Sequence, residues 1–248
     1  MSDLVLRHDS DGLATLVLNR PEKLNAMNSQ MFKDLRTHVD QLAYQVDTIG
    51  LVVLRGAGKC FSAGHDLSDL VVSDNTVATN FEAETIECLA NLPQPVISAV
   101  HGHCYTGALE LALAGDLIFA SESASFADTH AKWSVTPIWG MSQRLPRRIG
   151  LSRAREMMFT GRSYKGLDAL AMGLVNFCAA DDTFDDELEI LVREMLSLSW
   201  HTHRANKRLL LETDGMPLGG GLEHEIKHTA GVGPDMRNRI AAFTNKKR

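Results

Sequence analysis

Two stretches of the sequence share one design: an apolar strand, a glycine-bearing turn and the start of a helix. They are LVVLRGAGKCFSAGHDL (residues 51–67) and PVISAVHGHCYTGALELAL (residues 95–113). The first N–H groups of a helix have no partner within the helix and lie at the positive end of its dipole. Each turn therefore offers a backbone donor to an anion, and two converging donors form an oxyanion hole. For either turn alone, the alternative is that glycine only supplies a positive φ.

The rest of the chain alternates strands and helices around these two units. An Asp-Gly step at residues 11–12 separates two β-rich runs and predicts an antiparallel hairpin. A helix capped by Asn28 or Ser29 should follow, because apolar residues then recur at helical spacing, at Met31, Leu35, Leu42 and Val46. Strands are expected at residues 51–54, 94–102 and 116–121, with helices at 77–91 and from 107 onward. This order predicts an α/β fold of right-handed repeats.

The last third of the sequence is mostly helical. We expect a core over residues 1–195 and a C-terminal helical region over 196–248 that contains the apolar runs RLLLE and IAAF. The segment TDGMPLGGG (residues 213–221) lies between these two apolar runs. Its triple glycine is predicted to be a hinge and not a phosphate cradle, because no strand precedes it.

Composition excludes several classes of protein. The chain has 248 residues with 44% hydrophobic content, enough for one domain with a sizeable core. A net charge of −6 argues against a nucleic-acid partner. The four cysteines contain no CxxC pair, which argues against a metal site or a disulfide framework and favours the cytoplasm. Neither a signal sequence nor a membrane span is expected.

One acidic residue stands in unusual company. Glu110 lies among Ala108, Leu109, Leu111 and Ala112. Burial in such surroundings raises the pKa of a carboxyl group, which suits a general acid or base near neutral pH. The alternative is a carboxylate that the helix dipole favours in the first turn.

Five segments, in order over nearly the whole chain, resemble the crotonase or enoyl-CoA hydratase/isomerase superfamily. They are NRPEKLNAMN, GAGKCFSAGHDL, PQPVISAVHGHCYTGALELALAGDLIFAS, SFADTHAKWSVTPIWGMSQRLPRRIG and AREMMFTGRSYKGLDALAMGLVN. The resemblance implies a spiral of ββα repeats with a helical C-terminal region that forms homotrimers or homohexamers. It also implies an enzyme of fatty acid metabolism whose substrate is an acyl-CoA thioester, so that coenzyme A enters with the substrate and no separate cofactor is needed.

The resemblance also assigns binding roles. The two backbone donors to the thioester oxygen fall on His65 and Gly107. Residues matching the family's coenzyme A contacts are Lys23, Leu24, Ala26, Ala63, Asp66, Leu67 and, in the C-terminal tail, Lys246. A solvated surface lysine is the alternative for Lys23. Trp133 and Trp139 are expected to shape the acyl pocket, with core packing as the alternative.

Hydratases of this family use two glutamates, and this chain matches only the first of them. Glu110 stands at the first position and His130 at the second, with Asp128 as a reserve acid. Imidazole offers one donor and one acceptor, so hydration of a 2-enoyl-CoA stays feasible. The alternatives are enoyl-CoA isomerisation, another crotonase reaction such as carbon–carbon bond hydrolysis, or a protein that binds CoA esters without turnover.

Overall fold

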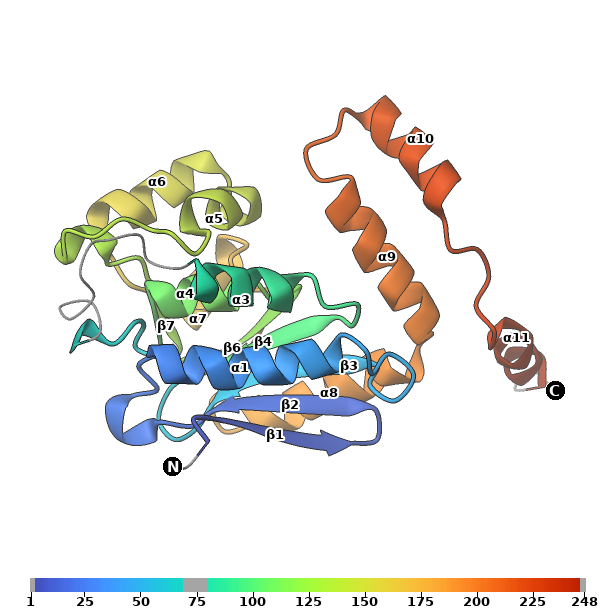
Figure 1. Cartoon of the computed structure of the whole chain (residues 1–248), viewed down its shortest axis with the longest axis horizontal. Helices are drawn as coiled ribbons and strands as arrows, with labels where there is room; N and C mark the ends of the chain where they lie inside the picture. Colours follow the sequence, from blue (N-terminus) through green and yellow to red (C-terminus); the bar gives the residue numbers. More distant parts are fainter. Residues whose placement is uncertain (1–2, 69–79, 246–248) are drawn as a thin grey trace.

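The computed structural model describes residues 3–68 and 80–245. Its largest element is a six-stranded sheet, and all of its strand pairs are parallel except β1 with β2 (Figure 1). In spatial order its strands are β1 (Val5–Ser10), β2 (Leu13–Leu18), β3 (Leu51–Gly56), β4 (Val96–Val100), β6 (Leu117–Ser121) and β9 (Phe177–Ala179). The predicted hairpin is confirmed: Asp11 and Gly12 form its turn, both at positive φ, as a two-residue hairpin turn requires.

A second, three-stranded sheet alternates with the first along the chain. It contains β5 (His103–Tyr105), β7 (Ser125–Ala127) and β8 (Tyr164–Lys165). β4 leads into β5 through Gly102, and β6 leads into β7, so each of these two strands of the large sheet is followed by a strand of the small sheet. An isolated bridge between Ser62 and Cys104 places the segment after β3 in the same pattern. The predicted ββα spiral is therefore present.

Helices cover both faces of the large sheet. One face shares an apolar core with α1 (Ser29–Leu42), α3 (Phe81–Ala90), α4 (Gly107–Ala112), α5 (Met141–Ile149), α6 (Leu151–Thr160) and α7 (Gly166–Ala171). The other packs against α8 (Phe184–Ser197). β4 is buried at every residue, which explains why its sequence is apolar except for Ser98. Asn28 caps α1 by accepting a hydrogen bond from the Met31 amide. Of the helix predicted over residues 77–91, residues 77–79 lie outside the described residues.

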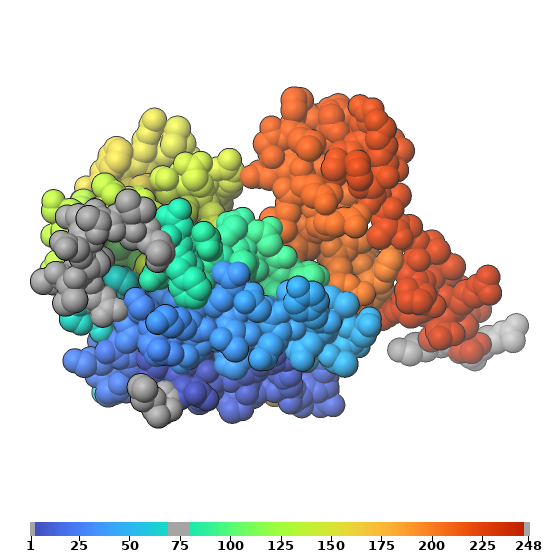
Figure 2. Space-filling model, viewed as in Figure 1, coloured from blue at the N-terminus to red at the C-terminus, as the bar shows by residue number. Residues whose placement is uncertain are grey.

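The C-terminal helices leave this core. α9 (Trp200–Glu212), α10 (Leu218–His228) and α11 (Met236–Asn245) extend to one side, and Figure 2 shows them as a separate lobe. A partly buried ion pair joins α9 to the core, with Nζ of the buried Lys207 2.7 Å from Asp116 Oδ2. The hinge prediction for the triple glycine is wrong: all three glycines lie inside α10. The boundary proposed at residue 195 falls in the last turn of α8 and stays a prediction.

Within residues 3–68 and 80–245, no helix is both long and apolar enough to span a bilayer. The same ranges contain no cluster of three or more His, Cys, Asp or Glu side chains arranged to hold a metal ion.

Candidate active site

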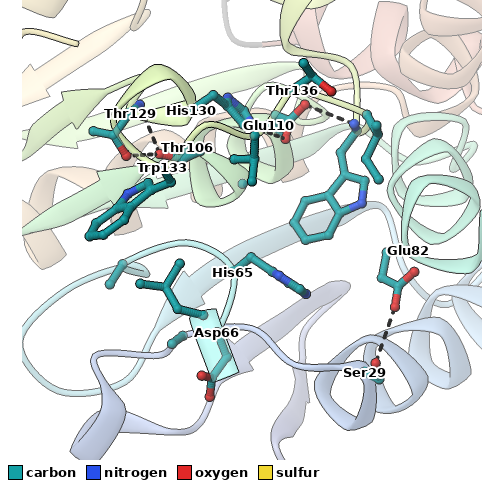
Figure 3. A pocket seen from close by; sticks show the side chains of 17 residues that line it. Ser29, His65, Asp66, Glu82, Thr106, Glu110, Thr129, His130, Trp133 and Thr136 are labelled. Carbon is teal, nitrogen blue, oxygen red and sulfur yellow. Dashed lines mark hydrogen bonds and ion pairs between the residues drawn. The ribbon is translucent and has the colours of Figure 1, made fainter. Parts of the chain in front are cut away.

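A cavity of about 540 Å³ lies where the two strand-to-helix turns meet (Figure 3). The segment after β3 provides one wall with His65, and the start of α4 provides another with Gly107 and Glu110. His130 lies in the short 3₁₀ helix η2 (His130–Lys132) that follows β7. The four residues predicted to be catalytic, although 65 positions apart at the extremes, thus line one cavity.

The backbone at His65 and Gly107 comes close together. The C=O of Gly64 accepts a hydrogen bond from the Met27 amide at 2.8 Å. Because a peptide bond is planar and trans, the N–H of His65 points the opposite way, away from Met27. A Cβ placed on Gly64 would lie only 2.8 Å from the Tyr105 carbonyl oxygen, and one placed on Gly107 would lie 3.5 Å from the His65 nitrogen. Glycine is therefore required for this close approach.

The residue before Gly107 has a strained backbone. Thr106 has a φ of 53° and a ψ of −110°, a region that a β-branched residue rarely adopts. Its hydroxyl accepts a hydrogen bond from the Thr129 amide at 3.1 Å and makes a second contact with the Thr129 hydroxyl. These contacts hold the turn in the conformation that starts α4 at Gly107.

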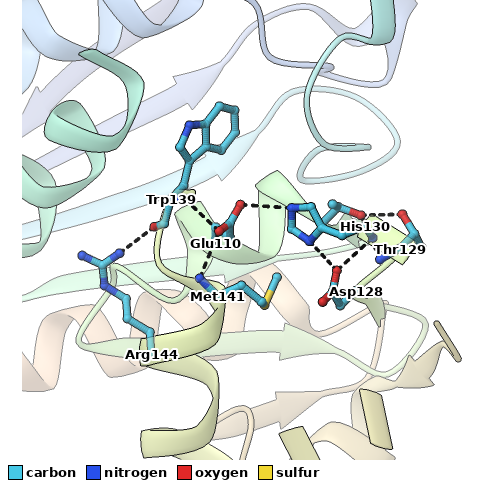
Figure 4. Close-up of polar contacts among 8 residues, drawn as sticks. Glu110, Asp128, Thr129, His130, Trp139, Met141 and Arg144 are labelled. Carbon is cyan, nitrogen blue, oxygen red and sulfur yellow. Dashed lines mark hydrogen bonds and ion pairs between the residues drawn. The ribbon is translucent and has the colours of Figure 1, made fainter. Parts of the chain in front are cut away.

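Glu110 is buried, with 1% of its surface exposed, and one of its oxygens is fixed. Oε1 accepts hydrogen bonds from the Trp139 and Met141 amides, both at 3.0 Å (Figure 4). Burial raises the pKa of the Glu110 carboxyl group, and the Met141 amide and His130 oppose this effect. Burial is the largest of these effects, and the expectation of a raised pKa is met.

His130 lies between two carboxyl groups (Figure 4). Its Nδ1 is 2.6 Å from Asp128 Oδ1, and its Nε2 is 3.6 Å from Glu110 Oε2. Asp128 Oδ1 also accepts the His130 amide at 3.0 Å. A carboxylate only accepts hydrogen bonds, so Nδ1 carries a proton directed at Asp128, and in the neutral form of the imidazole Nε2 is an acceptor that faces Glu110. The sequence suggested Asp128 only as a reserve acid, whereas here it orients His130.

The predicted coenzyme A contacts divide into three groups. Ala26, Ala63, Asp66 and Leu67 line the cavity. Lys23 and Leu24 are not among its described lining residues, although the Leu24 carbonyl accepts the Ala63 amide at 2.9 Å. Lys246 lies outside the described residues. The binding roles of all seven residues stay predictions.

Asp66 carries a charge at the cavity wall. Hydrogen bonds from Ser68 and Arg20 lower its pKa to about 2, and Arg20 Nη1 lies 2.6 Å from Asp66 Oδ2. The positive charge of Arg20 compensates the negative charge of this carboxylate, so that Asp66 offers little repulsion to an anionic ligand.

Sequence reasoning missed the amides that hold Glu110. They come from Trp139 and Met141, 29 and 31 residues further along the chain, and only the folded structure brings them to α4. The contact of Asp128 with His130 had a local signal, because an Asp side chain commonly binds the backbone N–H two residues on.

Comparison with known proteins places this chain in a family. The family model described as enoyl-CoA hydratase/isomerase matches residues 8–244. A crystal structure of an enoyl-CoA hydratase from Bacillus anthracis superimposes with a TM-score of 0.93 at 29% identity, covering 98% of this chain and 96% of that one. The fold is therefore that of the crotonase superfamily.

Sequence relatives agree. A probable enoyl-CoA hydratase of Mycobacterium leprae is 31% identical over 250 residues, which cover 99% of this chain and 96% of that protein. The 1,2-epoxyphenylacetyl-CoA isomerase of Escherichia coli K12 is 32% identical over 256 residues, covering 100% and 97%. The chain belongs to the enoyl-CoA hydratase/isomerase family, as its sequence motifs indicated.

Proposed function

We propose that this enzyme acts on an acyl-CoA thioester and adds water across the double bond of a 2-enoyl-CoA. The observation that carries the proposal is the pair formed by Glu110 Oε2 and His130 Nε2, 3.6 Å apart in the cavity that the His65 and Gly107 backbones also line. This distance is too long for a direct hydrogen bond. A water molecule beside the pair can instead hydrogen-bond to both atoms.

The proposed reaction begins with the thioester oxygen at the two amides of His65 and Gly107. Glu110 Oε2 takes a proton from the water, whose oxygen forms a bond to Cβ. The π electrons of the double bond move to the thioester, and the two amides stabilise the enolate oxygen. Glu110 then returns the proton to Cα, so the product is a 3-hydroxyacyl-CoA and the carboxylate is regenerated.

His130 replaces the second carboxylate in this scheme. With Nδ1–H donating to Asp128, Nε2 accepts a hydrogen bond from the attacking water and turns a water lone pair toward Cβ. Asp128 fixes this tautomer from a buried position, with 1% of its surface exposed. It acts through His130 and is a positioning residue.

The direct test uses crotonyl-CoA, followed by absorbance of its conjugated double bond and by mass. Loss of absorbance with the mass gain of one water supports hydration. Consumption of a 2- or 3-enoyl-CoA without a change of mass would instead indicate isomerisation. Cleavage of the acyl chain would indicate carbon–carbon bond hydrolysis, and binding without turnover of any thioester would indicate a CoA-ester-binding protein.

Asp128→Asn is expected to lower kcat about 10–100-fold, because a hydrogen bond to a charged group contributes about 1.5–3 kcal/mol. The Asn amide can donate to Nδ1 and so favours the tautomer with the proton on Nε2, which no longer accepts from water. KM should change little, since Asp128 is not among the described residues lining the cavity. Asp182→Asn, on the exposed surface, is the control. If the loss of kcat is accompanied by a loss of thermal stability and the pH profile is unchanged, Asp128 has only a structural role.

We also propose that the C-terminal lobe assembles copies of this chain into trimers or hexamers. α10 and α11 bury none of their residues against the core. Large apolar side chains on α9 and α10 are exposed, including Leu210, Leu218, Leu222 and Ile226. Such a surface in a single chain is typical of an interface between subunits.

Light scattering at micromolar concentration should give the mass of three or six chains. The double variant Leu222→Asp and Ile226→Asp should release monomers, because both side chains are exposed on α10 and a charge there opposes burial. Glu223→Gln, on the same helix, is the control. A monomeric wild-type protein would rule out the proposed assembly.

A further inference from the structure

We infer that Trp139 closes the acyl end of the cavity and restricts this enzyme to short acyl groups. The inference rests on the proposed function, because it takes the amides of His65 and Gly107 as the site of the thioester oxygen. The Trp139 indole is in contact with the His65 ring, and a second tryptophan, Trp133, is found in the same cavity. Both tryptophans line the cavity, but Trp139 is 7% exposed and Trp133 is 55% exposed.

The indole is held next to the proposed carbonyl site. Its ring centroid is 5.1 Å from that of His65 and 4.9 Å from that of Phe32 in α1, both in edge contacts. A Cβ on Gly107 would lie 2.5 Å from the indole Cζ3. The ring therefore occupies the space directly beside both amides, and packing on two sides prevents it from swinging away.

The main chain of Trp139 is fixed as well. Its amide donates to Glu110, and its carbonyl accepts from Arg144 Nη1 at 2.8 Å. Arg144 is paired in turn with Glu87 of α3. In the proposed reaction Glu110 faces the reacting double bond, and its Oε1 binds the amide of the residue that carries the indole. The indole is therefore next to the place where the acyl chain continues past Cβ.

A second cavity lies behind this residue. It has a volume of about 700 Å³ and is lined by parts of α3 and α5. Among the described lining residues, the two cavities share Ile138 and Trp139. These two residues are thus the wall between the reaction cavity and the next empty space, and a long acyl chain meets the indole first.

The test measures dissociation constants of saturated butyryl-, hexanoyl- and octanoyl-CoA for the intact protein, so it needs no turnover. Wild type should bind octanoyl-CoA at least about tenfold more weakly than butyryl-CoA, the smaller end of the discrimination that a filled pocket gives against extra methylenes. Trp139→Ala should reverse the order, with a gain of up to about fourfold for each methylene buried in the vacated space. Trp139→Leu, which keeps contact with Phe32, should give an intermediate order and guards against misfolding of the alanine variant.

Trp133→Ala is the matched control, because it removes the same side chain from the open side of the same cavity. It should weaken all three ligands by a similar factor and leave the length preference unchanged. Equal affinity of wild type for butyryl- and octanoyl-CoA, or an unchanged order in both Trp139 variants, would overturn the inference while leaving hydration intact. Failure of wild type to bind any acyl-CoA would overturn the proposed function with it.

Discussion

Glu110→Gln is expected to lower kcat about 10²–10⁴-fold, the usual range for a group that transfers a proton in the transition state. The substitution preserves shape, and the Gln carbonyl oxygen can still accept the Trp139 and Met141 amides that hold Oε1. What it removes is the proton acceptor at Oε2. The binding of butyryl-CoA should therefore stay within a few-fold of wild type, which steady-state kinetics and calorimetry would measure separately.

Glu84→Gln, the same change at an exposed position of α3, is the control and should retain wild-type activity. A Glu110→Gln protein that is folded and as active as this control would exclude Glu110 as the acid/base group. Activity would then have to depend on another group, with His130 in the cavity and Asp128 behind it the first to be tested.

The pH profile gives an independent measure of the same group. Burial raises the pKa of Glu110, and the proposed base must be ionised. Wild-type kcat/KM should therefore rise with pH along a limb displaced above the ordinary glutamate pKa of about 4.3. In the same window the folded state binds more protons than the unfolded one, so the free energy of unfolding should fall as pH rises. Glu110→Gln should lack both contributions, whereas an acidic limb that persists unchanged would assign it to another group.

Local patterns in the sequence predicted most of the fold. The Asp-Gly turn, the Asn28 cap and the apolar runs of the strands act over a few residues, and the structure contains each of them. The hinge prediction for the triple glycine was wrong because it relied on the low helix propensity of glycine. Gly219 to Gly221 lie in the first helical turn, and the following residues continue α10. Propensity is a weak prior that context overrides.

The site was predicted less completely, for a related reason. Positions such as Glu110 and Gly107 follow a strand-to-helix turn, so their neighbourhood could be inferred from nearby residues. The partners that determine how Glu110 works come from the segment around Trp139, and sequence spacing says nothing about a contact across 29 positions. The expected role of Trp139 as a wall of the acyl pocket also became specific only through its contacts with Phe32 and His65.

His65→Pro tests the backbone donor that the turn after β3 supplies. Proline has no N–H, and loss of one donor to an oxyanion typically costs about 10²–10³ in kcat. The position tolerates the change better than Gly107 does, because a substituent at Gly107 also collides with the Trp139 indole. The residue before a proline is restricted partly because its Cβ clashes with the proline ring. Here that residue is Gly64, at a φ of 109°, which has no Cβ.

The matched control is His65→Ala, which keeps the amide and removes only the imidazole and its contact with Trp139. It should lose less than about tenfold, since an aromatic edge contact contributes about 0.5–1.5 kcal/mol. A large loss for proline beside a small one for alanine, with similar thermal unfolding of both variants, separates the amide from the side chain. Equal losses would assign the effect to the imidazole, and a fully active, folded His65→Pro enzyme would remove this amide from the mechanism. The Gly107 amide would then be the one remaining donor of the proposed pair. The strained backbone of Thr106, which sets the position of Gly107, would serve that single donor.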